Sequence, residues 1–309
     1  MRTRIYVDGY NLYYGCLKNT GYKWLDLFTL FDRFILPRSG SGAHASNISI
    51  KYFTAEIHES AANDLDSVND QRTYHQALRY HRQSEIEIIK GSYNIDKVDS
   101  HRVEPAKKLR ESTKVKVWKI EEKQSDVNLS VSAVYDALIE DDLEQIVFVT
   151  NDTDIVPALS KIKSFNDVLV QEENRKPITI GLVIPARDSN KDRRANKDLD
   201  DLSDWTVHYI KSSELNDSQL PMRITSGRKP ATRPISWFKN STKVDYIYQA
   251  LLGVEKSPSK VWRWLESSKP NVDGLPNLGK LPIEMLDCEK EIEDVIAHVD
   301  AYVKYKNSF

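Results

Sequence analysis

Four aspartates follow short apolar runs in this chain of 309 residues, at Asp8, Asp126, Asp152 and Asp154. The runs are Ile5–Val7, Val115–Ile120 and Val147–Val149, and their β-branched and aromatic content is typical of buried strands. Because parallel strands end at one edge of a sheet, we expect the four carboxylates to form a single acidic mouth. Crowded carboxylates repel one another, and a divalent cation relieves that repulsion. The sequence therefore predicts a Mg²⁺ or Mn²⁺ site with all four aspartates as ligands.

A purely structural interpretation of the same residues stays open. Asp8-Gly9 is also a common turn, and Asn151–Asp154 is also a typical helix N-cap, because Asp, Asn and Thr side chains hydrogen-bond to nearby backbone N–H groups.

Strand-like runs alternate with helical patterns along the first two thirds of the chain. The strands are expected at Ile5–Asp8, Ile48–Ala55, Ile86–Gly91, Val115–Ile120, Gln145–Thr150 and Ile178–Ile184. The helices are expected at Leu25–Leu36, Asp66–Gln83, Val127–Glu140 and Ile155–Lys163. This alternation predicts an α/β fold, with a mostly parallel sheet covered by helices on both faces. The third helix carries a stripe that we expect in the core, made of Leu129, Ala133, Val134, Ala137 and Leu138.

The composition is that of an ordinary folded domain, with 40% hydrophobic and 29% charged residues. No apolar run approaches the ~20 residues that span a bilayer, and Met1–Ile5 leads directly into the first strand, so no secretory signal is expected. Cys16 and Cys288 do not make a disulfide framework. We therefore expect a cytoplasmic protein without membrane contact. The net charge of −2 argues against a nucleic-acid coat protein but not against a nuclease.

The chain changes character near residue 214. The stretch 214–241 is rich in Pro, Ser and Thr and has no sustained apolar period, so it is interpreted as a linker. It separates a domain at 1–213 from a small all-α domain at 242–309, whose size is close to the lower limit for an independent core.

Three motifs in order resemble the NYN domain, the PIN-like branch of metal-dependent ribonucleases. They are Asp8-Gly-Tyr-Asn11, Lys123-Gln-Ser-Asp126 and Thr150-Asn-Asp-Thr-Asp154. The resemblance covers roughly residues 1–214, and it departs from the commoner pattern at Asn151, where Gly is usual, and at Ile155, where Phe is usual. It implies a PIN-like sheet and a metal-dependent endoribonuclease that hydrolyses RNA phosphodiester bonds.

Hydrolysis of a phosphodiester by bound cations gives each polar residue an expected role. Asp8 and Asp152 are expected to bind the metal directly or through one water, and Asp126 completes the ring. Asp154 is expected either to bind the metal or to hold a metal-bound water, and Asn11 is expected to orient Asp8 or a phosphate oxygen. No zinc spacing, P-loop or G-x-G-x-x-G loop offers a different centre. A phosphatase of the haloacid-dehalogenase type is disfavoured because position 10 is Tyr rather than Asp.

Basic residues are expected to form a phosphate-binding rim beside the acids, at Lys123, Arg187, Lys191, Arg193, Arg194 and Lys197. Five of them follow the last expected strand and would reach the same edge of the sheet, although a solvated charged loop is an equal alternative. Tyr10, Tyr13 and Tyr14 could stack on bases but are expected mainly in packing.

The C-terminal region resembles the toxin-binding domain of Xre/MbcA/ParS-type antitoxins. The residues that carry this resemblance are Trp264-Leu265, Pro270-Asn271, Leu278-Gly279 and Pro282–Leu286. It implies a module that dimerises and presents a surface to a partner, which could be a protein of toxin–antitoxin type; a generic helical bundle is the alternative. We expect a homodimer through this domain, with Trp262 as the interface candidate because it lies on a different helical face from Trp264. The alternative function is therefore a non-catalytic or weakly active regulatory module that binds RNA or protein.

Overall fold

A computed structural model describes residues 1–40, 47–57, 66–105, 107–172, 176–190, 193–226, 229–267 and 274–308. The described residues divide into two compact units. Unit 1 comprises Met1–Lys18, Leu25–Leu220 and Ile224–Ala231, and unit 2 comprises Asn19–Trp24, Pro221–Arg223 and Thr232–Phe309. No helix in the described ranges is long and apolar enough to cross a membrane.

Unit 1 contains a seven-stranded sheet with the order β4-β3-β2-β1-β5-β6-β7. Its strands are β1 (Arg2–Asp8), β2 (Asn47–Ala55), β3 (Ile86–His101), β4 (Lys114–Lys123), β5 (Gln145–Val149), β6 (Thr179–Val183) and β7 (Trp205–Val207). All pairings are parallel except β3 with β4. Every residue of β5 is buried, which explains its apolar run. The predicted α/β class with a mostly parallel sheet is confirmed.

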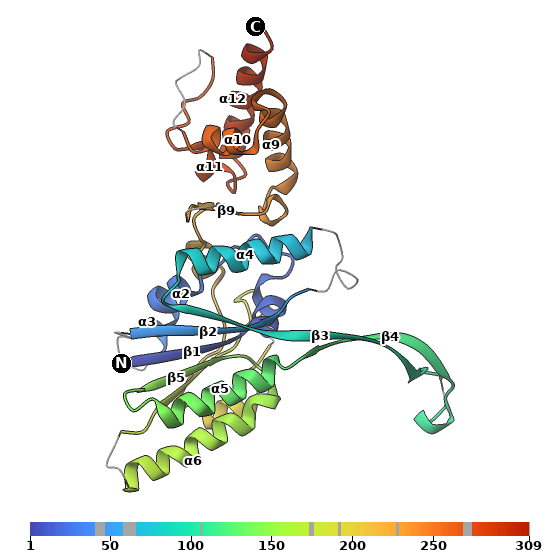
Figure 1. The fold of residues 1–309 in the computed structure, drawn as a ribbon, viewed down its shortest axis with the longest axis vertical. Helices are drawn as coiled ribbons and strands as arrows, with labels where there is room; N and C mark the ends of the chain where they lie inside the picture. Colours follow the sequence, from blue (N-terminus) through green and yellow to red (C-terminus); the bar gives the residue numbers. More distant parts are fainter. Residues whose placement is uncertain are drawn as a thin grey trace. The chain divides into compact units, whose positions relative to one another are not determined.

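Helices cover both faces of this sheet (Figure 1). One face carries α2 (Leu27–Leu30) and α4 (Ser67–His81), and the other carries α5 (Ser125–Ile139) and α6 (Val156–Glu172). The remaining elements of unit 1 are α1 (Gly9–Leu12), η1 (Tyr13–Leu17), η2 (Phe31–Ile35), α3 (Leu36–Arg38), η4 (Leu109–Glu111), η5 (Thr153–Ile155), α7 (Lys197–Leu202) and α8 (Ser212–Asp217). The helix predicted at Leu25–Leu36 is thus divided into α2 and a π-helical turn.

The inner face of α5 packs Leu129, Ala133 and Ala137 into the core. Leu138 is 51% exposed, so its predicted place in the core is wrong. The helix begins two residues earlier than expected, at Ser125. The side of α5 that faces the sheet is centred on Leu129, Ala133 and Ala137, and Leu138 lies one residue beyond it on the outer face.

The prediction that Val115–Ile120 forms a buried parallel strand is wrong, because β4 is antiparallel to β3 and largely exposed. β3 pairs with β2 only as far as Gly91 and then continues beyond the sheet, where Ser92–His101 pairs with β4. These two segments form a long hairpin that we call the arm, Ser92–Lys123, and it projects away from the body of unit 1 (Figure 1). Residues of β4 up to Ile120 are exposed, because no layer covers this hairpin.

Unit 2 is a small helical bundle formed by α9 (Ser241–Glu255), α10 (Pro258–Leu265), α11 (Pro282–Met285) and α12 (Glu291–Lys306). The stretch predicted as a linker contains α8, the short strands β8 (Arg223–Ile224) and β9 (Ala231–Thr232), and η6 (Ile235–Trp237). Arg233 is 1% exposed within it and donates to the carbonyls of Gly21 and Trp237, besides its ion pair with Asp287.

Candidate functional site

Asp8 lies at the carboxyl end of β1 and is 3% exposed. Its Oδ1 accepts a hydrogen bond from the backbone N–H of Asn11 at 2.9 Å, and its Oδ2 accepts from Asn11 Nδ2 at 2.6 Å and from Thr150 Oγ1 at 2.9 Å. Asp8 therefore caps α1, as the structural interpretation of Asp8-Gly9 anticipated. Burial raises the pKa of this carboxyl, although the bonds from Asn11 and Thr150 oppose that effect.

Gly9 is required directly after Asp8 by close packing. A Cβ atom at this position would lie 2.6 Å from the carbonyl oxygen of Phe53 and 2.9 Å from the Tyr52 ring. The first helix can therefore begin against β2 only if residue 9 has no side chain, and this start brings Asn11 back to Asp8.

Asp152 caps the turn that follows β5. Its Oδ1 accepts from the backbone N–H of Asp154 at 3.0 Å, and its own N–H donates to Thr150 Oγ1 at 3.1 Å. Thr150 thus links the two strand ends, because its hydroxyl contacts both Asp8 and Asp152. Asp154 lies in the exposed first turn of η5.

Asp126 reaches the same edge of the sheet by an unexpected route. The arm returns with Lys123 opposite Ser92, and α5 starts immediately afterwards. The Lys123 carbonyl and Ser125 hydroxyl pack over Gly91, within 2.5 and 2.7 Å of where a Cβ would stand. Burial raises the pKa of Asp126 to about 6, and the nearby charges of Asp8, Asp152, Glu122 and Asp154 add to this rise. The predicted acids are therefore close enough for the charges of Asp8, Asp152 and Asp154 to raise the pKa of Asp126.

The acids do not converge as metal ligands. Among the described residues, no group of three or more His, Cys, Asp or Glu side chains is placed to hold a metal ion. The oxygens of Asp8 face hydrogen-bond donors of the chain itself, and Asp152 serves a helical cap. The neighbouring charges still raise the pKa of Asp8 and of Asp126, because Coulomb interaction falls slowly with distance.

The loop after β6 is attached to this edge by Asn151. Its Nδ2 donates to the carbonyl of Arg194 at 3.1 Å, and its Oδ1 accepts from the N–H of Asn196 at 2.8 Å. Arg193 donates from Nη2 to Asn11 Oδ1 at 3.0 Å. Asn151 is therefore the side chain that positions the basic loop.

The predicted basic rim is only partly assembled. Arg187 and Arg193 both lie close enough to Cys16 to oppose the rise in its pKa, which burial brings to about 12. Lys123 is paired with Glu121 on the arm at 2.7 Å, and Lys197 is exposed at the start of α7. Lys191 lies outside the described residues.

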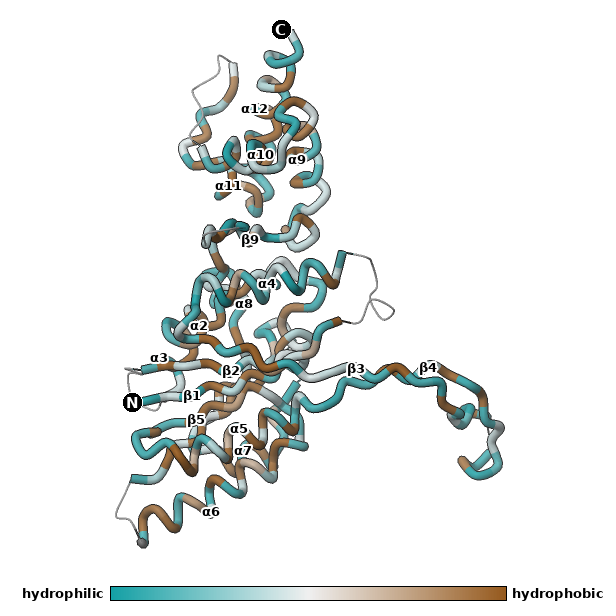
Figure 2. Tube along the Cα trace, in the orientation of Figure 1, coloured by the Kyte–Doolittle hydropathy of each residue, from teal (hydrophilic) through white to brown (hydrophobic). Residues whose placement is uncertain are grey.

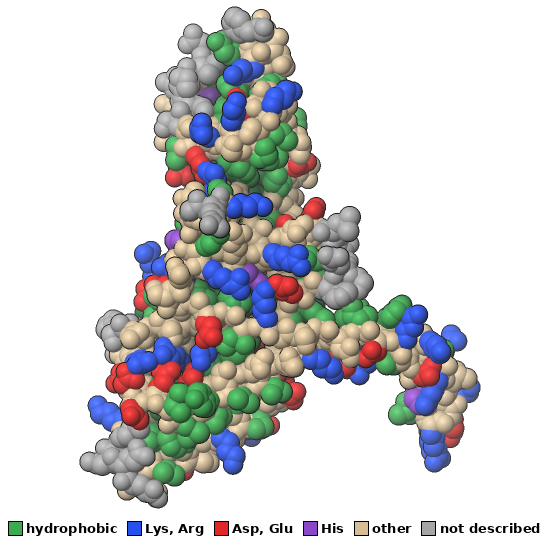
Figure 3. All heavy atoms as spheres, viewed as in Figure 1, with side chains coloured by type: hydrophobic (Ala, Val, Ile, Leu, Met, Phe, Trp, Pro, Cys, Tyr) green, Lys and Arg blue, Asp and Glu red, His purple; other side chains and the backbone are tan. Residues whose placement is uncertain are grey.

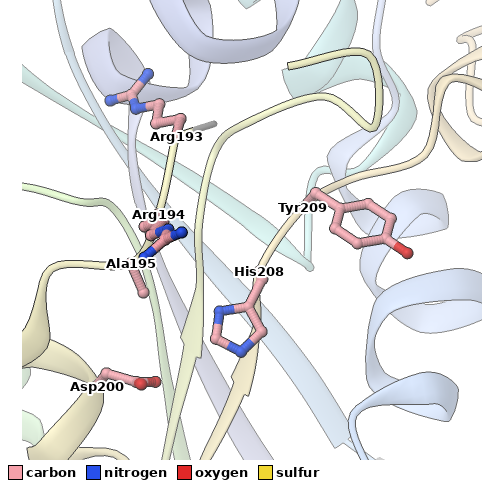
Figure 4. A pocket seen from close by; sticks show the side chains of 6 residues that line it. All are labelled: Arg193, Arg194, Ala195, Asp200, His208 and Tyr209. Carbon is pink, nitrogen blue, oxygen red and sulfur yellow. The ribbon is translucent and has the colours of Figure 1, made fainter. Parts of the chain in front are cut away.

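A cavity of about 400 Å³ adjoins Arg193 and is lined by Arg193, Arg194, Ala195, Asp200, His208 and Tyr209. Figure 4 shows that its side chains come from two segments, and that the His208 and Tyr209 rings point to different sides. Tyr209 is held by Arg38, whose guanidinium donates to its carbonyl oxygen and lies 5.5 Å from its ring. His208 and Tyr209 follow β7, which was missing from the predicted strands. An apolar alternation in Trp205–Val207 is the signal that could have indicated them.

No model of a known protein family matches this chain. A relative from Pseudomonas putida (strain DSM 28022 / S16), the 6-hydroxy-3-succinoylpyridine 3-monooxygenase HspA, is 39% identical over 315 residues, covering 98% of this chain and 95% of the relative. A crystal structure of a protein of unknown function from Vibrio parahaemolyticus RIMD 2210633 is 17% identical and covers 68% of this chain and 93% of its own, with a TM-score of 0.36. That likeness is too low to support an argument.

The relative corrects the predicted function. A monooxygenase is an oxidoreductase, so the prediction of a hydrolase of the endoribonuclease type, with Mg²⁺ or Mn²⁺ bound by Asp8, Asp126, Asp152 and Asp154, is wrong. The physical reason is that carboxylates at a sheet edge serve caps and proton exchange as readily as metal binding. The resemblances to NYN and antitoxin domains stay predictions. Identity of 39% along nearly the whole of both chains places this protein in the family of the 6-hydroxy-3-succinoylpyridine 3-monooxygenase HspA.

Proposed function

We propose that this protein is a monooxygenase that oxidises a hydroxylated pyridine ring with an acidic side chain. The observation that carries the proposal is the 39% identity with HspA across 98% of this chain, because the matched region includes both units rather than one shared module. The name of the relative supplies the substrate class, a pyridine with a hydroxyl group and a four-carbon keto-acid substituent.

In a monooxygenation, one atom of O₂ enters the substrate and the other leaves as water. Two electrons from a reductant and two protons balance the reaction. Asp126 is suited to carry a proton, because a pKa of about 6 lets this carboxyl gain and lose a proton near neutral pH. The charges of Asp8 and Asp152 raise that pKa and would thereby adjust the proton affinity of Asp126, while each aspartate still caps its own helical turn.

The cavity beside Arg193 fits the acidic side chain of such a substrate. Its volume of about 400 Å³ lies within the range of small-molecule sites. Arg194 is exposed, and its guanidinium can bind a carboxylate through two parallel hydrogen bonds. His208 offers ring nitrogens to a ring hydroxyl or carbonyl group. Asp200, which also lines the cavity, would disfavour a second anion, and this gives the cavity a preference for one carboxylate.

The direct test is turnover of 6-hydroxy-3-succinoylpyridine by the purified full chain, with product analysis and measurement of O₂ consumption. NADH and NADPH serve as electron donors, each with and without added FAD or FMN. We expect substrate-dependent O₂ uptake and a product heavier by one oxygen or cleaved after its insertion. Label from ¹⁸O₂ should appear in the product, and its absence with every donor would refute the proposal.

The cavity is tested with a matched pair of variants. Arg194→Met should raise KM about tenfold or more while changing kcat less, because an arginine–carboxylate contact contributes on the order of 1.5–3 kcal/mol. Arg33→Met removes an exposed arginine on η2 and should leave KM unchanged. Equal KM values for both variants would show that the substrate carboxylate binds elsewhere.

A further inference from the structure

The outer face of α5 carries an apolar stripe, made of Val127, Val131, Tyr135 and Leu138. These side chains are 64%, 62%, 58% and 51% exposed. Spacings of four, four and three residues place them on one face of the helix. Figure 3 shows hydrophobic side chains gathered on the surface over this helix. A continuous exposed stripe of this length is unusual, because soluble monomers rarely expose large contiguous apolar patches.

The arm is a second unsupported apolar surface in the same unit. From Ser92 onward the described strands pair only with each other, over ten residue pairs. Trp118 and Ile120 are 64% and 48% exposed on one face, and Val115 and Val117 are 41% and 38% exposed on the other. Figure 2 shows hydrophobic residues interspersed along its length. A two-stranded hairpin is marginally stable in water without a covering layer.

We propose that the protein forms a two-fold symmetric dimer in which the arm of each copy packs on the α5 stripe of the other. The arm leaves the body at the N-terminal end of α5 and runs away from it, so it does not cover the α5 stripe of its own copy (Figure 1). A second copy supplies both missing surfaces at once, because a two-fold interface uses each patch twice.

The area of the two contacts is set by the smaller surface. Ten residues per strand make the arm ~33 Å long, and two strands make it ~10 Å wide, so one face offers on the order of 300 Å². The α5 stripe runs for ~20 Å and limits each contact to on the order of 200 Å² on either side. Two contacts therefore bury on the order of 400 Å² per copy, about half of what a standard interface takes from each partner, which is typical of a weak dimer.

Charge also favours pairing of the arm with the body of another copy. The arm contains nine Lys and Arg residues and six Asp and Glu residues. The rest of the chain holds 35 of the 44 basic residues and 40 of the 46 acidic ones. The arm is therefore net positive and the remainder of the chain net negative, and this difference favours association of the two copies at low salt.

The aromatic side chains of unit 2 that were expected at an interface lie mostly in its own core. Trp262 and Trp264 are only 9% and 6% exposed, because both pack in the core of the bundle. Tyr246 is 49% exposed, but its hydroxyl donates to Asp300 at 2.7 Å. The expected aromatic surface is therefore largely used within unit 2.

Light scattering coupled to size-exclusion chromatography tests the proposal on the full chain. We expect wild type at twice 35.6 kDa. Val131→Glu and Trp118→Glu should each shift the protein to the monomer mass, since each places a charge within the buried contact. Tyr305→Glu changes a side chain that is 61% exposed on α12 and should remain dimeric. Circular dichroism should confirm that all three variants fold.

Mixing the two monomeric variants tests which surfaces meet. In a mixed dimer, the intact arm of the Val131→Glu copy faces the intact α5 stripe of the Trp118→Glu copy. One of the two contacts is thereby restored, so an equimolar mixture should form more dimer than either variant alone. A monomeric wild type, dimeric Val131→Glu or Trp118→Glu, or a mixture without added dimer would overturn the proposal.

Discussion

The raised pKa of Asp126 predicts that this carboxyl makes the fold less stable as pH rises. An aspartate in an unfolded chain has a pKa of about 3.9, whereas that of Asp126 in the fold is about 6. The folded state therefore binds this proton more tightly than the unfolded state does. The free energy of unfolding that this proton contributes is lost as pH rises through about 6. A difference of ~2 pKa units corresponds to ~3 kcal/mol, and solvent screening at this partly exposed side chain reduces that value to about 2 kcal/mol.

We therefore expect Asp126→Asn to stabilise the fold by about 2 kcal/mol above pH 7, and by much less below pH 4. Urea unfolding of wild type and variant at pH 4, 6 and 8 measures this divergence directly. Asp167→Asn, at an exposed position on α6, should show no comparable divergence. Identical free energies of unfolding for wild type and Asp126→Asn at pH 8 would refute the electrostatic picture of the sheet edge. The variant should also slow turnover, if Asp126 carries a proton.

Two further substitutions test how the fold holds its loops. Asn151→Ala removes both hydrogen bonds that attach the loop after β6, and should lower the free energy of unfolding by ~1–3 kcal/mol in urea titrations; an unchanged midpoint would show that the loop is held by Arg193 instead. Arg233→Met leaves Asp287 and two carbonyl groups without their buried partner, and should cost ~3–5 kcal/mol. Arg263→Met, at an exposed position on α10, is its control, and equal loss in both variants would argue against a specific role for Arg233.

The pattern of residues was sufficient to predict the architecture of unit 1. Fully apolar runs such as Gln145–Val149 and their alternation with helical patterns leave few arrangements other than a covered parallel sheet. The same rule predicted that Asp8 and Asp152 would share one edge, because the carboxyl ends of parallel strands meet there. That juxtaposition requires only that β1 and β5 run parallel in one sheet, which they do as direct neighbours.

Tertiary structure decided what those acids do. Whether Asp8 binds a cation or caps a helix depends on Thr150 and Asn11, and the contact with Thr150 joins residues 142 positions apart. The antiparallel return of the arm likewise places Asp126 beside Asp8, although the sequence of β4 resembles any other strand. Exposure of the α5 stripe is equally invisible in sequence, because a helix with apolar residues on two faces does not reveal which face the sheet will cover. Hydrophobic periodicity specifies the helices and strands. The protonation state, burial and contact partners of a side chain depend on how those elements pack together.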